Sequence, residues 1–494
     1  MTPFKRRSNA IPVASAVSVA VALAGCVSVG PDYHAPAVHL AANWQAAVPH
    51  EGSTRSLLQW WQGFNDPTLD ALLSQAEKSS PSLAQATAAI ASARATRAEA
   101  GADAYPSFTG SGSATRSGTI GSDSGAGTTA TEGFSNGSFI SAGTSGTTLS
   151  AGFDASWEID LFGSVRRNKE AADARVQAAE ADWHNARVSL AAEVASDYVS
   201  YRGCRKLAGN YRNNLASLQK TLDSTNAAVR QELMAPNDAT LAEAALASAA
   251  ASLNTQEVEC DIDVKELVAL TGIDEPELRT RLESGGDKIP TSASLDVTAL
   301  PVQLLSQRPD LVSSERSLAA ASADIGVTQA NRYPRLSLTG SIYASRIGSS
   351  GSTISSNPWS FGPSLSLPLF DGGKLAAQVD GKRASYASAL ASYEAAVRNA
   401  VKETEQALVR LDASKRRFAA VTSSATHYRK YYEVSYRNWQ AGNISLLTLE
   451  ESRRSALTAE QNEIGLERDR VLYAIALYKA LGGGWQAQQN NTGA

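Results

Sequence analysis

Residues 149–161 read LSAGFDASWEIDL, in which every odd-numbered residue is apolar and every even-numbered residue is polar or glycine. Successive side chains of a β-strand point to opposite faces, so the alternation predicts a strand with an apolar medium on one side and a polar one on the other. The length suits a tilted bilayer crossing, which takes about 9–11 residues. A half-buried strand of a soluble β-sandwich is the alternative.

The same alternation occurs twice more, at residues 336–342 (LSLTGSI) and 359–369 (WSFGPSLSLPL). The stretches beside these strands, residues 110–148 and 345–357, are rich in Gly, Ser and Thr. Such a composition is typical of a flexible linker, but between two membrane strands it predicts an extracellular loop. The chain is therefore expected to carry two β-hairpins, four strands in all.

Each hairpin belongs to one copy of an internal two-fold repeat. Pro81-Ser82-Leu83 matches Pro309-Asp310-Leu311, and Tyr105-Pro106 matches Tyr333-Pro334, both at an offset of 228 residues. An Ala-rich stretch between each pair predicts a helix of roughly 23 residues.

Long helical runs follow both hairpins, at residues 165–230 and 374–440, and neither contains Pro. At about 1.5 Å per residue each helix is roughly 100 Å long. Polar and apolar residues are mixed at helical spacing, with Ala frequent, as in laterally packed coiled-coil helices. A turn then reverses each chain, at residues 232–237 and 442–447, and the offset between the copies is now 210.

The return helices end near Gly272 and Gly482, since Gly suits the position after a helix. Each covers only about half of its long partner, so the short helix before each hairpin is expected to stack end to end with it. The remaining pieces should gather at that junction: residues 27–78, 273–305 and 483–494.

The N-terminus carries a secretory signal. Lys5-Arg6-Arg7 precede an apolar run at residues 11–23, which is too short to span a bilayer, and Leu23-Ala24-Gly25-Cys26 follows. The predicted organisation is a signal peptide (1–25), an anchored N-terminal and equatorial segment (26–78), a first repeat (79–272), an equatorial connection (273–305), a second repeat (306–482) and a tail (483–494).

Charge and chemistry-bearing residues exclude other classes. Without Lys5, Arg6 and Arg7, 42 of the 45 basic residues remain against 49 acidic ones, a net charge near −7. Phosphate contacts need clustered Lys and Arg, which are absent, so nucleic acid is not an expected partner. The five histidines are scattered, and no metal-ligand spacing, phosphate loop or catalytic triad is present, so neither a metal nor an enzyme activity is expected.

Two cysteines of the mature chain are expected to lie level with each other. Cys204 is on the outgoing helix of the first copy and Cys260 on the returning helix, and their midpoint, position 232, falls in the predicted turn. Residues of an antiparallel hairpin that are level have numbers that sum to twice the centre of the turn. A disulfide follows if both face the shared seam, in a compartment where disulfides persist. Two buried free thiols are the alternative.

These features together resemble the TolC-like outer-membrane efflux proteins, in particular their NodT/RND outer-membrane lipoprotein branch. The motifs that carry the resemblance span nearly the whole mature chain in order: Cys26 with Val29-Gly30-Pro31-Asp32-Tyr33, Trp60-Trp61 with Phe64, Asp66-Pro67 and Leu69, Trp157-Glu158 with Asp160-Leu161-Phe162-Gly163, Arg308-Pro309-Asp310-Leu311, Arg332-Tyr333-Pro334, and Pro368-Leu369-Phe370-Asp371-Gly372-Gly373. One position departs from the pattern, because Glu232 stands where the family often has Gly, as at Gly442.

The resemblance implies an α+β fold and a homotrimer. Cys26 resembles a lipobox cysteine, whose acylation would anchor the chain in the outer membrane; an ordinary signal peptide with a coincidental Cys is the alternative. Four strands cannot close a barrel, whereas three chains supply twelve and leave a passage, which a periplasmic barrel of long helices would continue. The implied function is the exit channel of a tripartite efflux system, passively conducting drugs or other small toxic compounds from an inner-membrane pump, of the RND type, and a periplasmic adaptor.

No cofactor is expected besides the covalent lipid. The resemblance also places the periplasmic aperture at the helix turns, with Asp238, Thr448, Glu450 and Glu451 as aperture residues whose repeated acids would favour cations. The alternative is that Glu450 and Glu451 pair with Arg453 and Arg454 on a solvated helix. The rival class of protein is a lipid-anchored periplasmic coiled coil, such as an adaptor or spacer, which does not explain the alternating hairpins.

Overall fold

The computed structural model describes residues 28–36, 60–118, 146–286, 288–291, 307–349 and 352–485, so the signal peptide and Cys26 lie outside the described residues. The chain is mostly helical with one sheet, an α+β fold. It divides into two compact units, which are described separately below: residues 1–35, 93–176 and 318–389 form the first, and residues 36–92, 177–317 and 390–494 the second.

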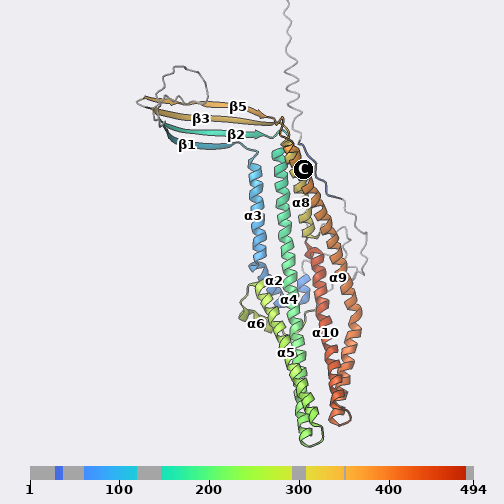
Figure 1. Cartoon of the computed structure of the whole chain (residues 1–494). Coiled ribbons are helices and arrows are strands. Elements are labelled where there is room, and N and C mark those ends of the chain that lie inside the picture. Colours follow the sequence, from blue (N-terminus) through green and yellow to red (C-terminus); the bar gives the residue numbers. More distant parts are fainter. Residues whose placement is uncertain are drawn as a thin grey trace, which may run out of the picture. The chain divides into compact units, whose positions relative to one another are not determined.

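The sheet lies in the first unit and is antiparallel throughout (Figure 1). Its strands are β1 (Ser107–Ser117), β2 (Gly146–Ile159), β3 (Arg335–Ser349), β4 (Ser352–Ser356) and β5 (Trp359–Ser366). Neighbours follow the order β1, β2, β3, β4, and β5 also pairs with β3. The predicted alternating strands at 149–161, 336–342 and 359–369 thus each form part of this one sheet.

The two faces of the sheet differ in chemistry. The register places Phe153 opposite Ile342, and Ile342 opposite Trp359, so these apolar side chains share one face, where they are 66%, 56% and 75% exposed. On the other face hydroxyl groups pair across the strands, with 2.8 Å between the Oγ atoms of Ser113 and Ser150. One face of the sheet is therefore apolar and the other polar, as the alternation predicted.

The strands extend beyond their predicted limits. Residues 110–117 and 146–148 were expected in the first loop, and residues 345–349 and 352–356 in the second, but all of them belong to strands. Gly, Ser and Thr are weak strand signals by themselves, and cross-strand pairing overrides local composition here.

The sheet has five strands where the sequence predicts four, because the last strand is interrupted at Asn357-Pro358. β4 and β5 continue one register against β3, with Ser356 opposite Ser345 and Trp359 opposite Ile342. Proline has no amide hydrogen to donate to the ladder, so it breaks the strand, although the Pro358 carbonyl still accepts from the Tyr343 amide at 3.0 Å.

Helices of matching length make up most of the remaining described chain. The short helices α3 (Pro81–Ala102) and α8 (Pro309–Ala330) have 22 residues each, and the long helices α4 (Ser164–Arg230) and α9 (Lys374–Gln440) have 67 each. Pro stands at the start of both short helices, where its missing amide hydrogen costs nothing. None of the described helices is long and apolar enough to cross a membrane.

The return helices are α5 (Pro236–Thr271) and α10 (Leu446–Ala480), each antiparallel to its long partner in Figure 1. Each begins one residue before the predicted end of its turn. Pro starts α5, whereas the hydroxyl of Ser445 caps α10 by accepting the Thr448 amide at 3.2 Å.

The two turns have the same backbone geometry despite the Glu-for-Gly difference. Glu232 has φ +58° and Gly442 has φ +74°, and each amide bonds the carbonyl three residues earlier. A left-handed conformation costs a non-glycine residue roughly 1–2 kcal/mol. Glu232 therefore adopts the same turn as Gly442, although the family often has Gly at this position, and its backbone is locally strained.

In the second unit, residues just before each short helix contact the end of the return helix. The Ser79 hydroxyl donates to the Thr271 carbonyl at 2.6 Å, and the Arg308 guanidinium donates to the Ala480 carbonyl at 3.1 Å. These contacts are those expected if α3 and α8 stack end to end with α5 and α10. Two helices that the sequence did not predict, α2 (Pro67–Ser79) and α6 (Glu275–Ser284), pack at the first of these junctions.

A buried arginine fixes that junction. Arg202 of α4 is 1% exposed and donates to the hydroxyl of Tyr198, to the Leu282 carbonyl at 3.0 Å and to the Gly286 carbonyl. Tyr198 in turn donates to Asp66 at 2.7 Å. A buried guanidinium must have its donors satisfied. This network therefore ties α4 to Asp66, just before α2, and to the C-terminal end of α6.

Candidate functional site

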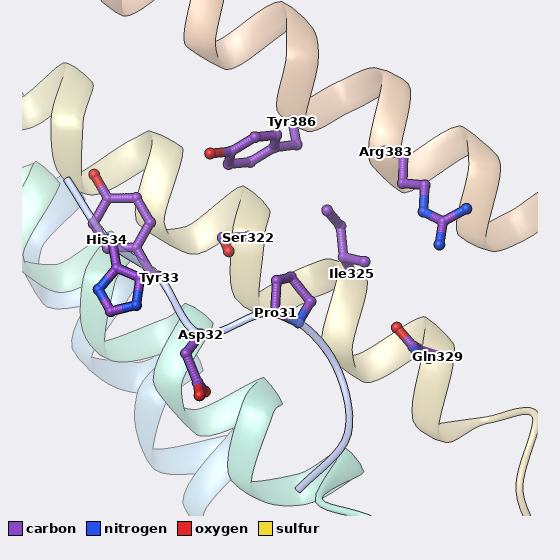
Figure 2. A pocket seen from close by; sticks show the side chains of 9 residues that line it. All are labelled: Pro31, Asp32, Tyr33, His34, Ser322, Ile325, Gln329, Arg383 and Tyr386. Atoms are coloured by element: carbon purple, nitrogen blue, oxygen red, sulfur yellow. The ribbon is translucent and has the colours of Figure 1, made fainter. Parts of the chain in front are cut away.

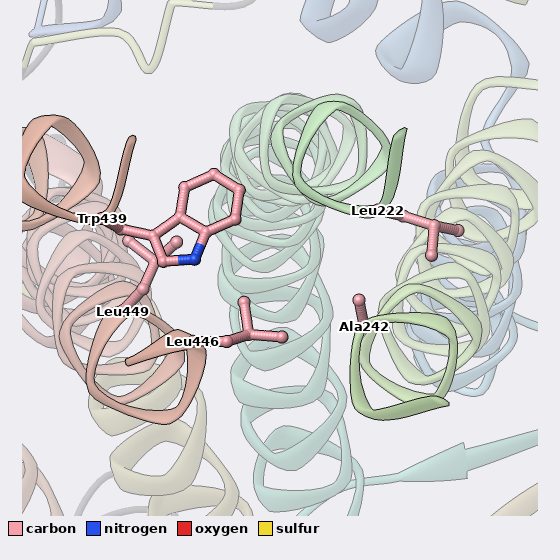
Figure 3. Packing of buried hydrophobic residues seen from close by; sticks show 5 residues of the cluster. All are labelled: Leu222, Ala242, Trp439, Leu446 and Leu449. Carbon is pink, nitrogen blue, oxygen red and sulfur yellow. The ribbon is translucent and has the colours of Figure 1, made fainter. Parts of the chain in front are cut away.

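The helix-turn ends of the two hairpins pack together in the second unit. Figure 3 shows Leu222 of α4, Ala242 of α5, Trp439 of α9, and Leu446 and Leu449 of α10, which form one buried cluster. All four helices contribute, so the two turns are held as one end of the unit. Burying a Leu or Trp side chain contributes about 1.5–3 kcal/mol, and the hairpins are therefore expected to separate only when this cluster opens.

Arg453 is a buried cation beside this cluster. Its side chain is 5% exposed, and its Nη2 donates to the Thr221 hydroxyl at 2.6 Å. The guanidinium carbon lies 5.2 Å from the centre of the Tyr432 ring, and Nε lies 3.4 Å from a carboxylate oxygen of Glu450. Neither Nε nor Nη1 has a hydrogen-bond partner among the described residues. One hydrogen bond, one aromatic ring and one carboxylate thus hold a buried charge between the hairpins.

Hydrophobic spacing offered a signal for Arg453 that sequence reasoning missed. Leu446, Leu449, Arg453 and Ala456 follow one another at intervals of three and four residues, which places them on one face of a helix, and all four are buried. Charge alone suggested a solvated position, but the apolar neighbours at helical spacing indicate an interior one.

The four predicted aperture residues fall into different environments. Glu450 is largely buried, pairs with Arg453, and has a pKa raised by burial. Glu451, the next residue, is exposed. Asp238 and Thr448 lie half-buried in the first turns of α5 and α10. The carboxylate that reaches solvent from α10 is therefore that of Glu451, while Glu450 takes the ion-paired role that was the alternative for both.

Asp238 and Thr448 also have a structural role. A carboxylate in the first turn of a helix is stabilised by the helix dipole, and Asp238 is the acidic residue of that turn in α5. The Thr448 amide donates to the capping Ser445. A residue at either position can therefore stabilise the start of its helix and also line an aperture.

Cys204 and Cys260 form a disulfide between α4 and α5, with 5.5 Å between their Cα atoms. Both are about 5% exposed and pack with Ala208, a small residue that lets the two helices approach. The structure thus brings together the two cysteines that the numbering placed at one level. The equivalent positions of the second hairpin, Ser414 and Arg470, carry no thiol, so only the first hairpin is covalently closed.

The segment that follows Cys26 is docked on the first unit. The Val29 amide donates to the Phe162 carbonyl at 3.1 Å, and Asp32 accepts from the buried Arg167 at 2.6 Å, a hydrogen bond that lowers the pKa of Asp32. Gly30 lies against Gly326 so closely that a Cβ atom would stand 2.4 Å from the Gly326 Cα. The chain is thereby held within a few residues of Cys26.

A cavity of about 410 Å³ adjoins this segment (Figure 2). It is lined by residues 31–34, by Ser322, Ile325 and Gln329 of α8, and by Arg383 and Tyr386 of α9. Among the described residues, no three His, Cys, Asp or Glu side chains are grouped so that they could hold a metal ion.

Comparison with known proteins agrees with this geometry. Residues 72–273 and 300–483 match the model of the outer membrane efflux protein family. The chain belongs to this family. It is 29% identical to nodulation protein T of Rhizobium leguminosarum, with 94% of this chain and 95% of the relative aligned, and 30% identical to outer membrane protein OprJ of Pseudomonas aeruginosa, with 95% of each aligned.

Solved structures of channels share the fold. The outer-membrane channel OprN matches with a TM-score of 0.78 at 30% identity, covering 93% of this chain and 99% of that one. The open state of the MtrE outer membrane channel of Neisseria gonorrhoeae matches with a TM-score of 0.76 at 25% identity, covering 93% and 99%. This family member is an outer-membrane channel component of an efflux system, and not an enzyme.

Proposed function

We propose that three copies of this chain close one channel, through which drugs or other small toxic compounds leave the cell passively. The observation that carries the proposal is the sheet, whose apolar face is uncovered in the single chain and whose outer strands, β1 and β4–β5, each have one unpaired edge. Open edges are not tolerated in lipid, and three sheets of four strand positions would close into a twelve-stranded barrel wide enough for a passage.

The helices continue this channel into the periplasm, where a periplasmic adaptor and an inner-membrane pump, of the RND type, would deliver the compounds. The matching lengths of α3 with α8 and α4 with α9 support an internal two-fold repeat, so three chains would supply six similar hairpins around the tunnel. Two relatives, a solvent efflux pump outer membrane protein of Pseudomonas putida and a pyoverdine export outer membrane protein of Pseudomonas aeruginosa, support the transport of small molecules.

Compound accumulation in a deletion strain tests the function. Loss of the chain should raise the intracellular level of at least one class in a panel of drugs, solvents and metal ions, and the wild-type gene should restore it. Heat-modifiable oligomers in the outer-membrane fraction should accompany that activity. A monomeric chain released with the periplasm would instead support the lipid-anchored coiled-coil spacer.

Acylation of Cys26 gives a prediction about the anchor. The Cys26→Ser variant should lose metabolic labelling with palmitate, whereas Cys204→Ser should keep it, because only Cys26 follows a lipobox. Retention in the membrane should weaken without vanishing, since the strands also hold the chain there. Labelling that persists in the Cys26→Ser variant would contradict the lipobox.

Glu451 gives a prediction about selectivity. The Glu451→Gln variant should lower the preference for cations, because three exposed carboxylates near the axis would attract them and an amide of the same shape would not. Single-channel recordings in planar bilayers measure this, with Glu394→Gln on α9, away from the turn, as the control. An unchanged ratio of cation to anion permeability would assign Glu451 to the solvated helix surface.

A further inference from the structure

The cavity of about 410 Å³ beside residues 31–34 lies entirely within the first unit. Its volume falls in the range of about 300–1,000 Å³ that is usual for small-molecule sites. In Figure 2 Tyr386 and Arg383 extend from α9 toward α8, and the segment of residues 31–34 crosses beside α8. The first unit therefore contains a space large enough for a small ligand, formed by three separate parts of the chain.

Ion pairs hold the helices around this cavity together. Asp324 of α8 accepts from Arg175 of α4 at 2.8 Å and from Lys382 of α9 at 3.0 Å. The segment is fixed as well, since Tyr33 packs against buried alanines of α4 and α8. The walls are thus in place before a ligand arrives, so binding needs little ordering of the chain.

Hydrogen-bond donors from two helices line one end of the cavity. Arg383 of α9 contributes a guanidinium and Gln329 of α8 a side-chain amide. In Figure 2 the Arg383 side chain extends toward the part of α8 that carries Gln329. The Arg383 side chain is 62% exposed, and its ion pair with Asp380 of the same helix, at 3.3 Å, leaves most of the guanidinium N–H donors for a ligand. This end of the cavity therefore suits an anion with several acceptor oxygens.

The acidic residue of the lining does not oppose an anion. Asp32 is bonded to the buried Arg167 at 2.6 Å, which balances its charge, and in Figure 2 its carboxylate points away from α9. Tyr386 and Ser322 add hydroxyl groups, which can donate or accept hydrogen bonds. Because the described lining offers no second carboxylate, a ligand with an ammonium group gains no ion pair there, whereas a purely anionic ligand gains one.

The donors lie near the junction of the helices with the sheet. Gln329 is one residue from the end of α8, and Arg383 is nine residues from the start of α9. At about 1.5 Å per residue, both backbones lie within roughly 14 Å of the helix ends that lead to the strands. The headgroup layer on each side of a bilayer is about 5–8 Å thick, and long basic side chains extend toward it. With the strands across the hydrocarbon core, Gln329 and the end of the Arg383 side chain reach the level of the headgroups.

We propose that this cavity binds the headgroup of an anionic phospholipid, such as phosphatidylglycerol, from the periplasmic leaflet of the outer membrane. Arg383 holds the phosphate oxygens with two parallel N–H donors, and Gln329 donates a further hydrogen bond. The hydroxyls of Tyr386 and Ser322 bond the glycerol of the headgroup. The bound lipid ties the ends of α8 and α9 to the membrane surface next to the strands. The proposal rests on the outer-membrane channel proposed above, but it does not require acylation of Cys26.

A lipid headgroup accounts for this site better than a soluble phosphate ester does. Pro31 and Ile325 add an apolar wall, and in Figure 2 they lie between Gln329 at one end and Tyr33 at the other. Such a wall suits the glycerol and ester part of a lipid, whereas a free phosphate gains nothing from it. The depth of the site also places it beside a leaflet that supplies phospholipid at a high local concentration.

Titration of the full-length channel in detergent with phosphatidylglycerol, read out by native mass spectrometry, tests the site. One tightly bound lipid per chain is expected in the wild type, and Arg383→Gln should weaken its binding at least tenfold, because the paired donors to the phosphate are lost. Arg398→Gln is the matched control. Arg398 lies further from the sheet on the same helix, is 78% exposed and pairs with Glu394 of that helix at 3.1 Å, so its replacement should leave lipid binding unchanged.

A second variant tests the charge of the ligand without a change of side-chain shape. Gln329→Glu puts a carboxylate in place of the amide and should also weaken phosphatidylglycerol binding at least tenfold, because like charges repel. Gln329→Met, which removes the donor without adding a charge, should have a smaller effect. The same spectra give the mass of each assembly, so a variant that fails to fold or assemble is recognised directly.

Three results decide between the possible occupants. Equal binding of phosphatidylglycerol by the wild type and Arg383→Gln, or a wild-type preference for phosphatidylethanolamine, would overturn the lipid site and leave the channel standing. Displacement of the lipid by soluble glycerol 3-phosphate would assign the cavity to a soluble phosphate ester instead. A chain that is absent from the outer membrane would overturn the channel itself.

Discussion

Replacing both Cys204 and Cys260 with serine is expected to lower the free energy of unfolding of the first hairpin by roughly 2–4 kcal/mol. The disulfide closes a loop with a sequence separation of 56 residues, so it removes much of the freedom of the unfolded hairpin. Changing both cysteines avoids a lone thiol that could pair wrongly. Hydrogen exchange measures the effect locally, because amides of α4 and α5 between the disulfide and the turn should then exchange roughly 30- to 1000-fold faster.

The second hairpin serves as the internal control. Ser414, the counterpart of Cys204, is buried and donates to the Leu411 carbonyl of its own helix, so Ser414→Ala should leave exchange in α9 and α10 nearly unchanged. Mass spectrometry of the unreduced mature protein gives the chemical test, in which the wild type should be two hydrogens lighter than its reduced form. Two free thiols on Cys204 and Cys260, or equal exchange in wild type and variant, would contradict the prediction.

The repeated helices could be predicted because local signals mark their ends. Pro81 and Pro309 open the short helices, and both Tyr-Pro pairs follow just after their ends. The absence of Pro over both long runs left no internal stop, and both helices extend over 67 residues. The same regularity predicted that Cys204 and Cys260 lie opposite each other, because two unbroken antiparallel helices determine which residues face one another.

Features that depend on tertiary packing could not be predicted. Residues 110–117 have a linker-like composition and become a strand only because β2 lies beside them. Arg202 and Arg453 are long charged side chains, which are almost never fully buried unless paired, so their charge predicts an exposed position and only the apolar spacing around Arg453 indicates otherwise. Their partners, the Leu282 carbonyl for one and the Thr221 hydroxyl for the other, come from distant parts of the chain.

Removal of the buried Arg453 charge is expected to loosen the contact between the two hairpin ends. An Arg453→Ala chain loses the bond to Thr221 and the contact with the Tyr432 ring, and it leaves the largely buried Glu450 without its cation. Breaking a buried ion pair by removing one partner costs about 3–5 kcal/mol. The equilibrium between the packed and the separated arrangement of the turns should therefore shift toward the separated one by a factor of about 100 or more.

Single-channel conductance reads out this shift directly, because the turns form the proposed aperture. Arg453→Ala channels should spend far more time in a high-conductance state, and cells that carry them should take up large antibiotics through the leak.

Arg454→Ala, which removes the neighbouring exposed charge, should behave like the wild type. Thr221→Val keeps the shape and removes the hydroxyl that accepts from Arg453 and donates to the Ser217 carbonyl. It should give a smaller effect of the same sign, since one hydrogen bond to a charged group contributes about 1.5–3 kcal/mol. Wild-type conductance in a folded, trimeric Arg453→Ala channel would show that the hairpin ends are held by the apolar cluster around Trp439 and Leu449 alone.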